Sequence, residues 1–527
     1  MANTSLVSFE SLRQRFTLVQ SSQHEPFYSY FFPYIILLVA VVWSNFYFFK
    51  LKTYNAELPI VNLTFGLEPR WFARLRWGLK SRHILSYASQ KFQGGAYRLV
   101  RGDADIIILP PSMIPELNRL PQNILNSREY HAFSVLGRIT GLDVVRKTDH
   151  HVRVILSRVS PAMPRLLQPM AHRIASASTR FFPQRRDKWE VIRPLESAGQ
   201  CVTEGIALAL FGQPTCDDPM LIRACFQLAT DAFTVVMVLR HLPSWLQPIV
   251  GWMLPIQWRL RRTWTEIENL VIPVIRQRQQ EGSLSKDLDL LSWMVTDGKL
   301  VGETDPRTLS RLAASVAVGG IYSTANIVVG VLADLLSHPE ILEEIRAEIR
   351  EKNEEINGHW NLAALNSLDK LDSVIKETSR LAPGSMLVYS RITQSKHTLS
   401  NNVSLRKGQF IAVSGLSRSM DPSLFPDPEV YNGLRHYSNL DDHRARPFSS
   451  IDGDILTWGA GRSACPGRFI ANGIIKILLV KLLDEFDFRF VESKPLQKVV
   501  CHEFVLFHPF NRLMVKRREH DLGIQFE

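Results

Sequence analysis

One cysteine stands in an unusually constrained stretch of the sequence. The segment WGAGRSACPGRFIA, residues 458–471, places Cys465 among three glycines, one proline and two arginines, just ahead of a long apolar run. Gly461 and Gly467 lie four residues before and two residues after the cysteine, where a tight turn can require a positive φ angle. Pro466 stiffens the exit from the loop. The loop is therefore expected to hold the sulfur of Cys465 in one position.

A fixed thiolate of this kind can ligate haem iron. Such a ligand pushes electron density onto the iron and favours cleavage of an O–O bond. Hydrogen bonds to the sulfur and limited solvent access tune the metal, so peptide N–H groups are expected to point at Cys465. The apolar run FIANGIIKILLVKLL within and after this segment is expected to pack as a helix beneath the cofactor.

A long apolar helix is predicted to begin at Pro306, which suits the first helical position behind Asp305, and to continue to about Ser337. Its middle is apolar all round, which is typical of a helix that runs through the interior. It nevertheless contains Gly319 and Gly320 side by side, and each glycine costs about 1 kcal/mol relative to alanine. That cost is tolerated where another group must approach the backbone closely. Close packing against another helix also explains the pair, and on these residues alone it is the simpler interpretation.

Two charged residues share one face of a later helix. In LDSVIKETSRLAP, residues 371–383, Glu377 and Arg380 are three residues apart and close enough to pair. The helix is expected to end near Pro383, because the residue before a proline disfavours the helical conformation. Taken alone, such a pair is usually a solvated surface pair.

Together, these segments in this order and spacing resemble the cytochrome P450 family of haem-thiolate monooxygenases, and in particular its microsomal fungal members of secondary metabolism. The resemblance extends from the N-terminal apolar segment to the tail of the chain. The matched positions are Trp458, Gly461, Cys465 and Gly467 in the family's cysteine loop, Glu377 and Arg380 in its Glu-x-x-Arg pair, Arg435 of PEVYNGLR as the third member of a buried triad, and 319–324 in the oxygen-side groove of the central helix.

The resemblance implies a mainly α fold with a minor β part, behind an N-terminal transmembrane helix. It implies haem b as the cofactor, with Cys465 as the axial ligand of the iron and with Gly319 and Gly320 beside its oxygen-binding face. Electrons would come from NADPH through a separate NADPH-cytochrome reductase, with cytochrome b5 as a second candidate donor. The enzyme would hydroxylate or otherwise oxidise a lipophilic biosynthetic intermediate, with a terpenoid placed ahead of a polyketide or an indole-derived scaffold.

The cysteine loop departs from the family pattern at one position. The family usually has a basic residue two positions before the cysteine, where it donates to a haem propionate, but this chain has Ser463 there. Propionate binding is therefore expected to shift to other basic residues. The candidates are Arg462, His151, Arg153 and Arg391.

The central helix departs from the family pattern as well. The usual acid-threonine pair is replaced by Tyr322 and Ser323, so that a hydroxyl group is kept but the carboxylate is not. Ser323 and Thr324, together with ordered water, are expected to carry protons on the oxygen side of the cofactor. The missing acid leaves one alternative open, which is a haem-thiolate isomerase or dehydratase that needs no O2. A membrane scaffold without activity is a more distant alternative, because the iron ligand and the triad are present.

Residues 26–49 form an uncharged stretch of twenty-four residues with aromatic side chains near both ends. Such a helix is long enough to cross a hydrocarbon core of about 30 Å. We expect a lumenal tail at 1–25, a transmembrane anchor at 26–49, a linker at 50–66 and a haem-binding catalytic domain at 67–527, with a cleaved signal peptide as the alternative.

Basic residues follow the span, so the positive-inside rule places the catalytic domain of this single-pass protein on the cytosolic side of the endoplasmic reticulum membrane. Of the glycosylation sequons, only that of Asn3 would then be modified.

Strands are predicted at three places in the otherwise helical body: a hairpin in 96–109, short strands in 403–414 and further strands in 499–516. The apolar segment HLPSWLQPIVGWMLP, 241–255, is expected to dip into the bilayer or to cover an apolar site, or else to be a partly buried connection. The basic and aromatic segment 70–82 is expected to be a helix along the membrane surface or an ordinary surface helix.

Two short segments are candidates for the substrate pocket. Residues 385–388 follow the Glu-x-x-Arg helix, and residues 504–507 lie in the tail. Both are apolar enough to belong to the core instead, and the residues alone do not separate the two interpretations.

The 527-residue chain carries a net charge of +11. Lys and Arg are spread along it without a nucleic-acid recognition motif, so no nucleic-acid partner is expected. A basic face toward anionic lipid or an acidic protein partner fits better. The five cysteines have no Cys-x-x-Cys spacing, which argues against a disulfide framework and against a structural zinc site.

Overall fold

The structure is a computed structural model that describes residues 58–65, 68–92, 94–282, 288–437 and 447–526. The predicted lumenal tail with Asn3, the predicted transmembrane anchor and most of the predicted linker lie outside these residues. Pro59–Glu527 forms one compact unit.

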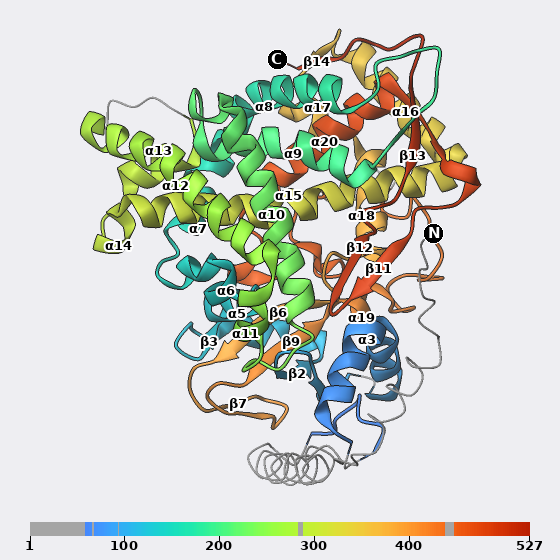
Figure 1. The fold of residues 1–527 in the computed structure, drawn as a ribbon. Coiled ribbons are helices and arrows are strands. Elements are labelled where there is room, and N and C mark those ends of the chain that lie inside the picture. The colour runs from blue at the N-terminus through green and yellow to red at the C-terminus, as the bar shows by residue number, and fades with distance from the viewer. Residues whose placement is uncertain (1–57, 66–67, 93, 283–287, 438–446, 527) are drawn as a thin grey trace, which may run out of the picture. The chain divides into compact units, whose positions relative to one another are not determined.

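The described part of the chain is mainly helical, as predicted (Figure 1). The helices are α3 (Arg70–Phe92), α4 (Ile114–Arg119), α5 (Ser127–Ser134), α6 (Gly137–Thr140), α7 (His150–Val154), α8 (Ser160–Phe181), α9 (Pro194–Phe211), α10 (Pro219–Leu239), α11 (Gln247–Met253), α12 (Pro255–Glu281), α13 (Leu290–Asp297), α14 (Val301–Thr304), α15 (Pro306–Ser337), α16 (Pro339–Glu355), α17 (Leu362–Asn366), α18 (Asp369–Leu381), α19 (Gly415–Ser419) and α20 (Arg468–Glu485).

Helix α15 is the centre of the helical layer and has the bounds that the sequence predicts. Asp305 caps it, because its carboxylate accepts a hydrogen bond of 2.9 Å from the N–H of Thr308. The helix packs against α9, α10, α12, α18 and α20, and it crosses the middle of the view in Figure 1. Its apolar residues belong to the large hydrophobic core that these helices share.

The β part is minor, and strands occur at all three predicted places. The strands are β1 (Tyr97–Val100), β2 (Asp105–Leu109), β3 (Leu125–Asn126), β4 (Glu190–Ile192), β5 (His359–Trp360), β6 (Leu387–Thr393), β7 (His397–Thr398), β8 (Ser404–Leu405), β9 (Phe410–Ser414), β10 (Phe486–Phe490), β11 (Lys498–Cys501), β12 (Phe504–Phe507), β13 (Leu513–Arg517) and β14 (Gln525–Phe526).

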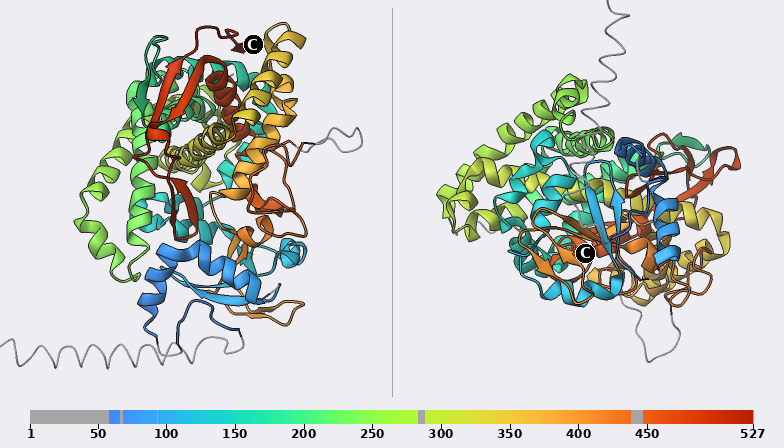
Figure 2. Two further views of the ribbon diagram at one scale, coloured as in Figure 1. Left: turned by 90° about the vertical axis from the view of Figure 1, so that its right-hand side faces the viewer. Right: turned by 90° about the horizontal axis from the view of Figure 1, so that it is seen from below.

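The largest sheet has five strands in the order β1-β2-β9-β6-β3. The predicted hairpin is confirmed, with β1 and β2 antiparallel, whereas β2 pairs with β9 in parallel. A second hydrophobic core joins this sheet to α3 and includes Trp77, Leu85, Leu99 and Ile106. Figure 2 shows α3 and the β1-β2 hairpin, in blue, next to each other at one end of the Pro59–Glu527 unit.

Two of the described helices, α10 and α15, are long and apolar enough to cross a membrane. In each, more than half of the most apolar window is buried inside the protein, at 56% and 61%. Both helices contribute to the large hydrophobic core, so their apolar character is explained by their packing.

Candidate active site

Cys465 lies in a tight loop between two short 3-10 helices, η6 (Leu456–Trp458) and η7 (Gly461–Ser463), and the start of α20. The N–H of Cys465 donates to the carbonyl of Trp458 at 2.8 Å, which closes the loop on itself. The indole of Trp458 in turn donates to the carbonyl of Phe448 at 2.5 Å. The aromatic residue of the motif therefore anchors the loop to the chain before it.

Gly461 has the positive φ that the sequence predicts, at +63°. A Cβ atom at this position would also lie 1.9 Å from the side-chain oxygen of Asn118. Both the backbone conformation and the close approach therefore require glycine here.

The expectation of a positive φ at Gly467 is wrong. Its φ is −84°, because it caps α20 and its backbone is already close to the helical conformation. No heavy atom lies within 4 Å of a Cβ built at Gly467 among the neighbours that the structure describes. Gly467 therefore borders open space, and its peptide N–H donates to the sulfur of Cys465.

Two opposing effects act on the pKa of the Cys465 thiol. Burial raises its pKa, whereas peptide N–H groups of Gly467 and Arg468 and the charge of Arg468 act in the opposite direction. The predicted N–H donors to the sulfur are present. Burial outweighs these donors, so the pKa of the Cys465 thiol is raised overall. A metal cation bound at the sulfur would deprotonate it.

The two neighbouring glycines of α15 have different surroundings. A Cβ at Gly320 would lie 2.9 Å from Ile206 of α9, so this glycine serves close helix packing. A Cβ at Gly319 would meet no described atom within 4 Å, and Gly319 is exposed although it lies in the middle of a core helix. Ser323, one turn later, is exposed as well. Because residues i and i+4 share a helix face, Gly319 and Ser323 form an open face on α15.

The hydroxyl group of Ser323 donates to the carbonyl of Gly319 at 2.9 Å. Thr324 is only 1% exposed and lies on the buried side of the helix. Tyr322, which replaces the family's acid, points to α10, where its ring stacks on that of Phe233 with centroids 5.1 Å apart. The structure thus places Ser323 on the open face and separates it from Thr324 and Tyr322.

Glu377, Arg380 and Arg435 meet in one buried cluster. Glu377 is 0% exposed and accepts hydrogen bonds from Arg380 at 2.8 and 2.7 Å and from Arg435 at 3.1 Å. His436, which the sequence analysis missed, adds a contact of 3.1 Å. Burial alone would raise the pKa of Glu377, but hydrogen bonds from Arg380 and His436 hold it at about 2. Glu377 is therefore a buried carboxylate that joins α18 to the segment after α19.

Arg391 of β6 is a buried cation. It is 6% exposed, it lies 4.0 Å from the ring centre of Tyr389, and it donates to the carbonyl of Ser390 at 2.8 Å. No carboxylate of the described residues forms an ion pair with it. Burial lowers its pKa. A buried guanidinium group without an acidic partner is costly unless an anion binds it.

Further basic side chains lie around Arg391. His131 of α5 is exposed, yet burial within the protein, with the charge of Arg391, lowers its pKa to about 4. These two facts agree if the imidazole lines an internal hollow. Burial, together with the charge of Arg128, also lowers the pKa of His151 to about 4, and its Nδ1 has no hydrogen-bond partner in the described part of the chain.

The other two propionate candidates have protein partners. Arg462 is exposed and donates to the carbonyl of Leu120 at 2.9 Å. Arg153 pairs with Asp149 at 3.0 Å and forms a close ion pair with Glu303. The charge of Arg153 is thus already compensated, whereas Arg391 has no ion-pair partner among the described residues. His131 and Arg128 were missed because nothing in their local sequence marks them.

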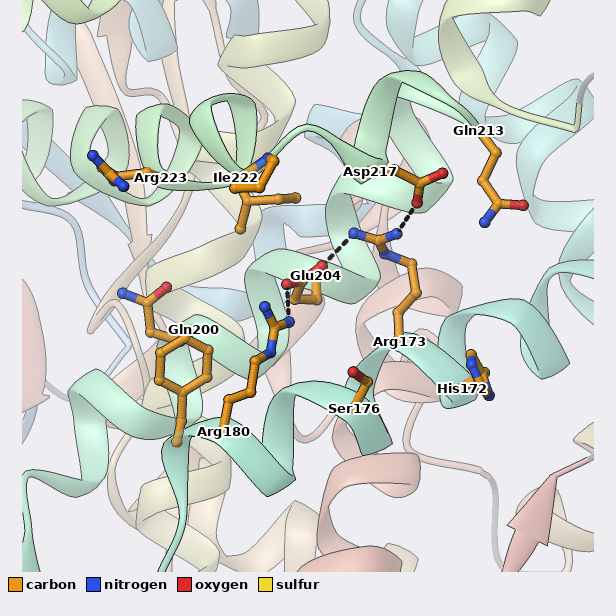
Figure 3. A pocket seen from close by; sticks show the side chains of 12 residues that line it. His172, Arg173, Ser176, Arg180, Gln200, Glu204, Gln213, Asp217, Ile222 and Arg223 are labelled. Atoms are coloured by element: carbon orange, nitrogen blue, oxygen red, sulfur yellow. Dashed lines mark hydrogen bonds and ion pairs between the residues drawn. The ribbon is translucent and has the colours of Figure 1, made fainter.

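A surface cleft of about 620 Å³ lies away from these residues, between α8, α9 and α10 (Figure 3). Arg173 forms close ion pairs with Glu204 and Asp217, and Arg180 also pairs with Glu204. The charged groups at the centre of the cleft therefore compensate one another. None of the predicted site residues lines it.

The chain belongs to the cytochrome P450 family, since residues 82–514 match the sequence model of that family. It is similar to cytochrome P450 monooxygenase AN1598 of Emericella nidulans, with 27% identity over 477 residues that cover 89% of this chain and 88% of the relative. It is 28% identical to cytochrome P450 monooxygenase olcJ of Penicillium canescens over 466 residues, 87% of this chain and 88% of the relative. Ent-kaurene oxidase of Gibberella intermedia is 27% identical over 473 residues, 88% of this chain and 89% of the relative.

The protein is therefore a cytochrome P450 monooxygenase with the P450 fold. Membership implies a haem iron held by a cysteine thiolate. The residues present fit such a group: Cys465 carries N–H donors at its sulfur, Gly319 and Ser323 border open space, and Arg391 is buried without a described acidic partner. A planar macrocycle with two anionic propionates requires these three features.

Proposed function

We propose that this monooxygenase oxidises a lipophilic biosynthetic intermediate of fungal secondary metabolism, with a terpenoid-type molecule as the substrate. Cys465 would hold the haem iron, and the observation that carries the proposal is its sulfur with peptide N–H donors from Gly467 and Arg468. The similarity to a relative named ent-kaurene oxidase supports the terpenoid class. Haem, when bound, supplies the iron at which O2 is activated.

The surrounding residues have separate roles in this proposal. Arg391, His151, Arg128, His131 and Arg462 are the residues that would hold the propionates. Trp458 and Gly461 fix the loop that carries the sulfur, and the open space at Gly319 would leave room for the cofactor and O2. Arg153 has no role toward the cofactor, because Glu303 and Asp149 compensate its charge.

The proposed substrate pocket lies beside a cluster of three aromatic side chains, each from a different element. Phe504 of β12 is half-buried, and its ring centre lies 5.9 Å from that of Phe233 of α10, which stacks on Tyr322. Ser385 forms a β-bridge with Phe504. By contrast, Met386 and Phe507 are buried in the core, at 0% and 2% exposure. We propose Ser385, Val388 and Phe504 as pocket residues. The apolar side chains of Val388 and Phe504 favour a lipophilic substrate.

Ser323 is the proposed group that holds and transfers a proton on the open face of α15. In the variant Ser323→Ala we expect the thiolate-type spectrum to be preserved, while hydrogen peroxide release rises and product formed per NADPH falls, by up to about 100-fold. The measurement compares NADPH consumption, peroxide and product in one reaction.

Ser315→Ala is the matched control for this variant. Ser315 lies on the same helix and donates to the carbonyl of Arg311 at 2.7 Å, as Ser323 does to Gly319. Its coupling should equal that of the wild type. Unchanged coupling in Ser323→Ala would exclude the proton-transfer role.

The proposed location is the endoplasmic reticulum membrane, with a single anchor at 26–49, glycosylation at Asn3 and the catalytic domain in the cytosol. Exposed apolar side chains on two segments support membrane contact. They are Trp71, Phe72, Leu75 and Leu79 on α3 and Trp245, Ile249, Trp252 and Met253 around α11. The two segments meet where Gly78 of α3 contacts His241. The proposed electron donors are an NADPH-cytochrome reductase and cytochrome b5.

The proposal is tested with the full chain and a fungal NADPH-cytochrome reductase in lipid vesicles. Comparing metabolites of the native host with and without this protein supplies the substrate. We expect product formation to require both NADPH and O2, and isotopically labelled O2 to deliver one labelled oxygen atom into a hydroxylated product. Turnover that needs neither NADPH nor O2 would instead establish the isomerase or dehydratase alternative. That alternative was open because Tyr322 replaces the family's acid.

A further inference from the structure

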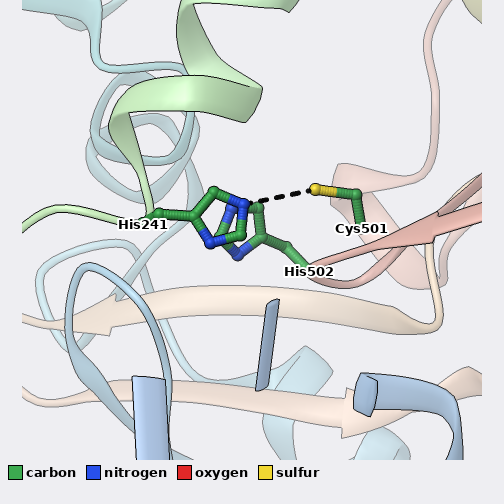
Figure 4. A group of neighbouring side chains, drawn as sticks. All are labelled: His241, Cys501 and His502. Carbon is green, nitrogen blue, oxygen red and sulfur yellow. Dashed lines mark hydrogen bonds between the residues drawn. The ribbon is translucent and has the colours of Figure 1, made fainter. Parts of the chain in front are cut away.

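A second cysteine lies in a group of potential metal ligands outside the candidate active site. Cys501 ends β11, His502 follows it in the turn before β12, and His241 lies just after α10. One donor atom from each residue lies within 4.8 Å of the other two. Figure 4 shows the three side chains close together, with the sulfur directed at the imidazole of His241.

The distances suit a tetrahedral ion. The sulfur of Cys501 lies 3.7 Å from Nε2 of His241. In a tetrahedral zinc site, with Zn–S near 2.3 Å and Zn–N near 2.05 Å, sulfur and nitrogen ligands are about 3.6 Å apart. The imidazole rings of His241 and His502 have centroids 4.3 Å apart, so both side chains lie close to the sulfur of Cys501 and to each other.

His502 lacks the partners that a buried imidazole normally has. It is 0% exposed, and neither of its ring nitrogens has a hydrogen-bond partner among the described residues. Nδ1 of His241 is also without one in this part of the chain. Buried polar atoms without partners are rare and costly. An ion bound to both imidazoles would satisfy one nitrogen of each ring.

The backbone around the cluster leaves room for these rings at two glycines. A Cβ at Gly78 of α3 would lie 2.3 Å from Cε1 of His241, so only glycine allows the imidazole this position. The N–H of His502 donates to the carbonyl of Gly78 at 3.2 Å. A Cβ at Gly102, in the β1-β2 turn, would collide with the backbone carbonyl of Arg240 and would lie 3.2 Å from Cε1 of His502, so this glycine mainly allows the close approach of Arg240. Two elements distant in sequence thus form the walls of the cluster.

The formal charges of the four buried side chains beside the cluster cancel. Arg240, next to His241, is buried and pairs with Asp103 at 3.1 Å and with Glu503 at 3.0 Å. Arg101 pairs with the same two carboxylates, at 2.8 and 3.3 Å. Two arginines therefore face two acids, and the adjacent network has no net charge.

We propose that His241, Cys501 and His502 form a binding site for a zinc-class divalent cation. One thiolate and two imidazoles suit zinc, whereas Mg²⁺ and Ca²⁺ prefer oxygen ligands. Cys501 is half-exposed, which gives the ion access and leaves the fourth position to water. The ion would tie the segment after α10 to the β11-β12 turn, which leads into Phe504. His241 and Cys501 are 260 positions apart, so the argument from Cys-x-x-Cys spacing could not reveal the site.

Zinc content of the full-length holoenzyme tests the proposal. The protein is equilibrated with micromolar free Zn²⁺ set by a metal buffer, freed of excess metal, and analysed for zinc and iron by mass spectrometry. We expect roughly one zinc per haem iron. Cys501→Ala and His241→Gln should reduce this ratio at least tenfold, whereas the matched control Cys225→Ala, a buried cysteine in α10, should keep it. Carbon monoxide spectra verify that each variant is folded.

Alkylation of the Cys501 thiol is a second measurement. A folding defect would not produce its expected result. Zn²⁺ should protect the thiol of Cys501 from iodoacetamide in the wild-type holoenzyme, whereas Mg²⁺ should not. X-ray absorption at the zinc edge should show one sulfur and two imidazole ligands. Three results would overturn the proposal. The first is a zinc-to-haem-iron ratio below about one tenth in the wild type, and the second is that Cys501→Ala and His241→Gln both retain zinc. The third is equal protection of Cys501 by Mg²⁺.

Discussion

Replacing Cys465 by alanine is expected to reduce monooxygenase turnover to background. The reason is that the sulfur of Cys465, with N–H donors from Gly467 and Arg468, is the group that would bind the iron and favour O–O cleavage. Arg391 and its basic neighbours do not depend on the sulfur, so the variant should retain part of its haem. The measurement is product formation with reductase and NADPH, beside haem content per protein.

Cys225→Ala is the matched control, because Cys225 is buried in α10 and far in sequence from the loop. Its turnover should stay within about twofold of the wild type. If Cys465→Ala oxidised the substrate at the wild-type rate, another residue would have to be the axial ligand.

Glu377→Gln is expected to lower the free energy of unfolding by about 3–5 kcal/mol. The substitution removes the carboxylate that compensates Arg380, which is 0% exposed, and Arg435. Glu343→Gln is the control, because Glu343 is exposed in its pair with Arg346 and such pairs contribute less than about 1 kcal/mol. Chemical denaturation of the holoenzyme at neutral pH measures both.

The effect of Glu377→Gln should depend on pH. The pKa of Glu377 is lowered from 4.5 to about 2 in the folded protein, so its stabilisation is fully present above the unfolded pKa and is lost as the pH falls toward the folded pKa. The difference in stability between wild type and variant should therefore shrink below about pH 4.5. A difference that stays constant from pH 7 to pH 3 would contradict the ionised state of Glu377.

Local signals in the sequence were sufficient to predict the helices that carry the site residues. Asp305 and Pro306 predicted the start of α15 because capping is decided by neighbouring residues, and the fixed spacing of Glu377 and Arg380 predicted their pairing. The conformation of Gly467 was wrongly predicted, because this glycine directly precedes α20 and its backbone is already close to the helical conformation.

Contacts between distant segments could not be predicted in this way. His131 approaches Arg391 only through the packing of α5 on β6, and Arg128 of the same helix approaches His151. Thr324 and Ser323 are neighbours in sequence, but one helical step of about 100° turns Thr324 into the core. His241 and Cys501 meet only in the folded chain, since 260 positions separate them.

We propose above all that Cys465 binds the iron of the haem through its sulfur. The most direct measurement is the absorption spectrum of the reduced, full-length protein after addition of carbon monoxide, with haem content determined independently on the same sample. We expect the strongly red-shifted Soret band of a thiolate-ligated, carbonyl-bound haem. A Soret band at the position typical of histidine ligation, in protein that contains its full complement of haem, would contradict it.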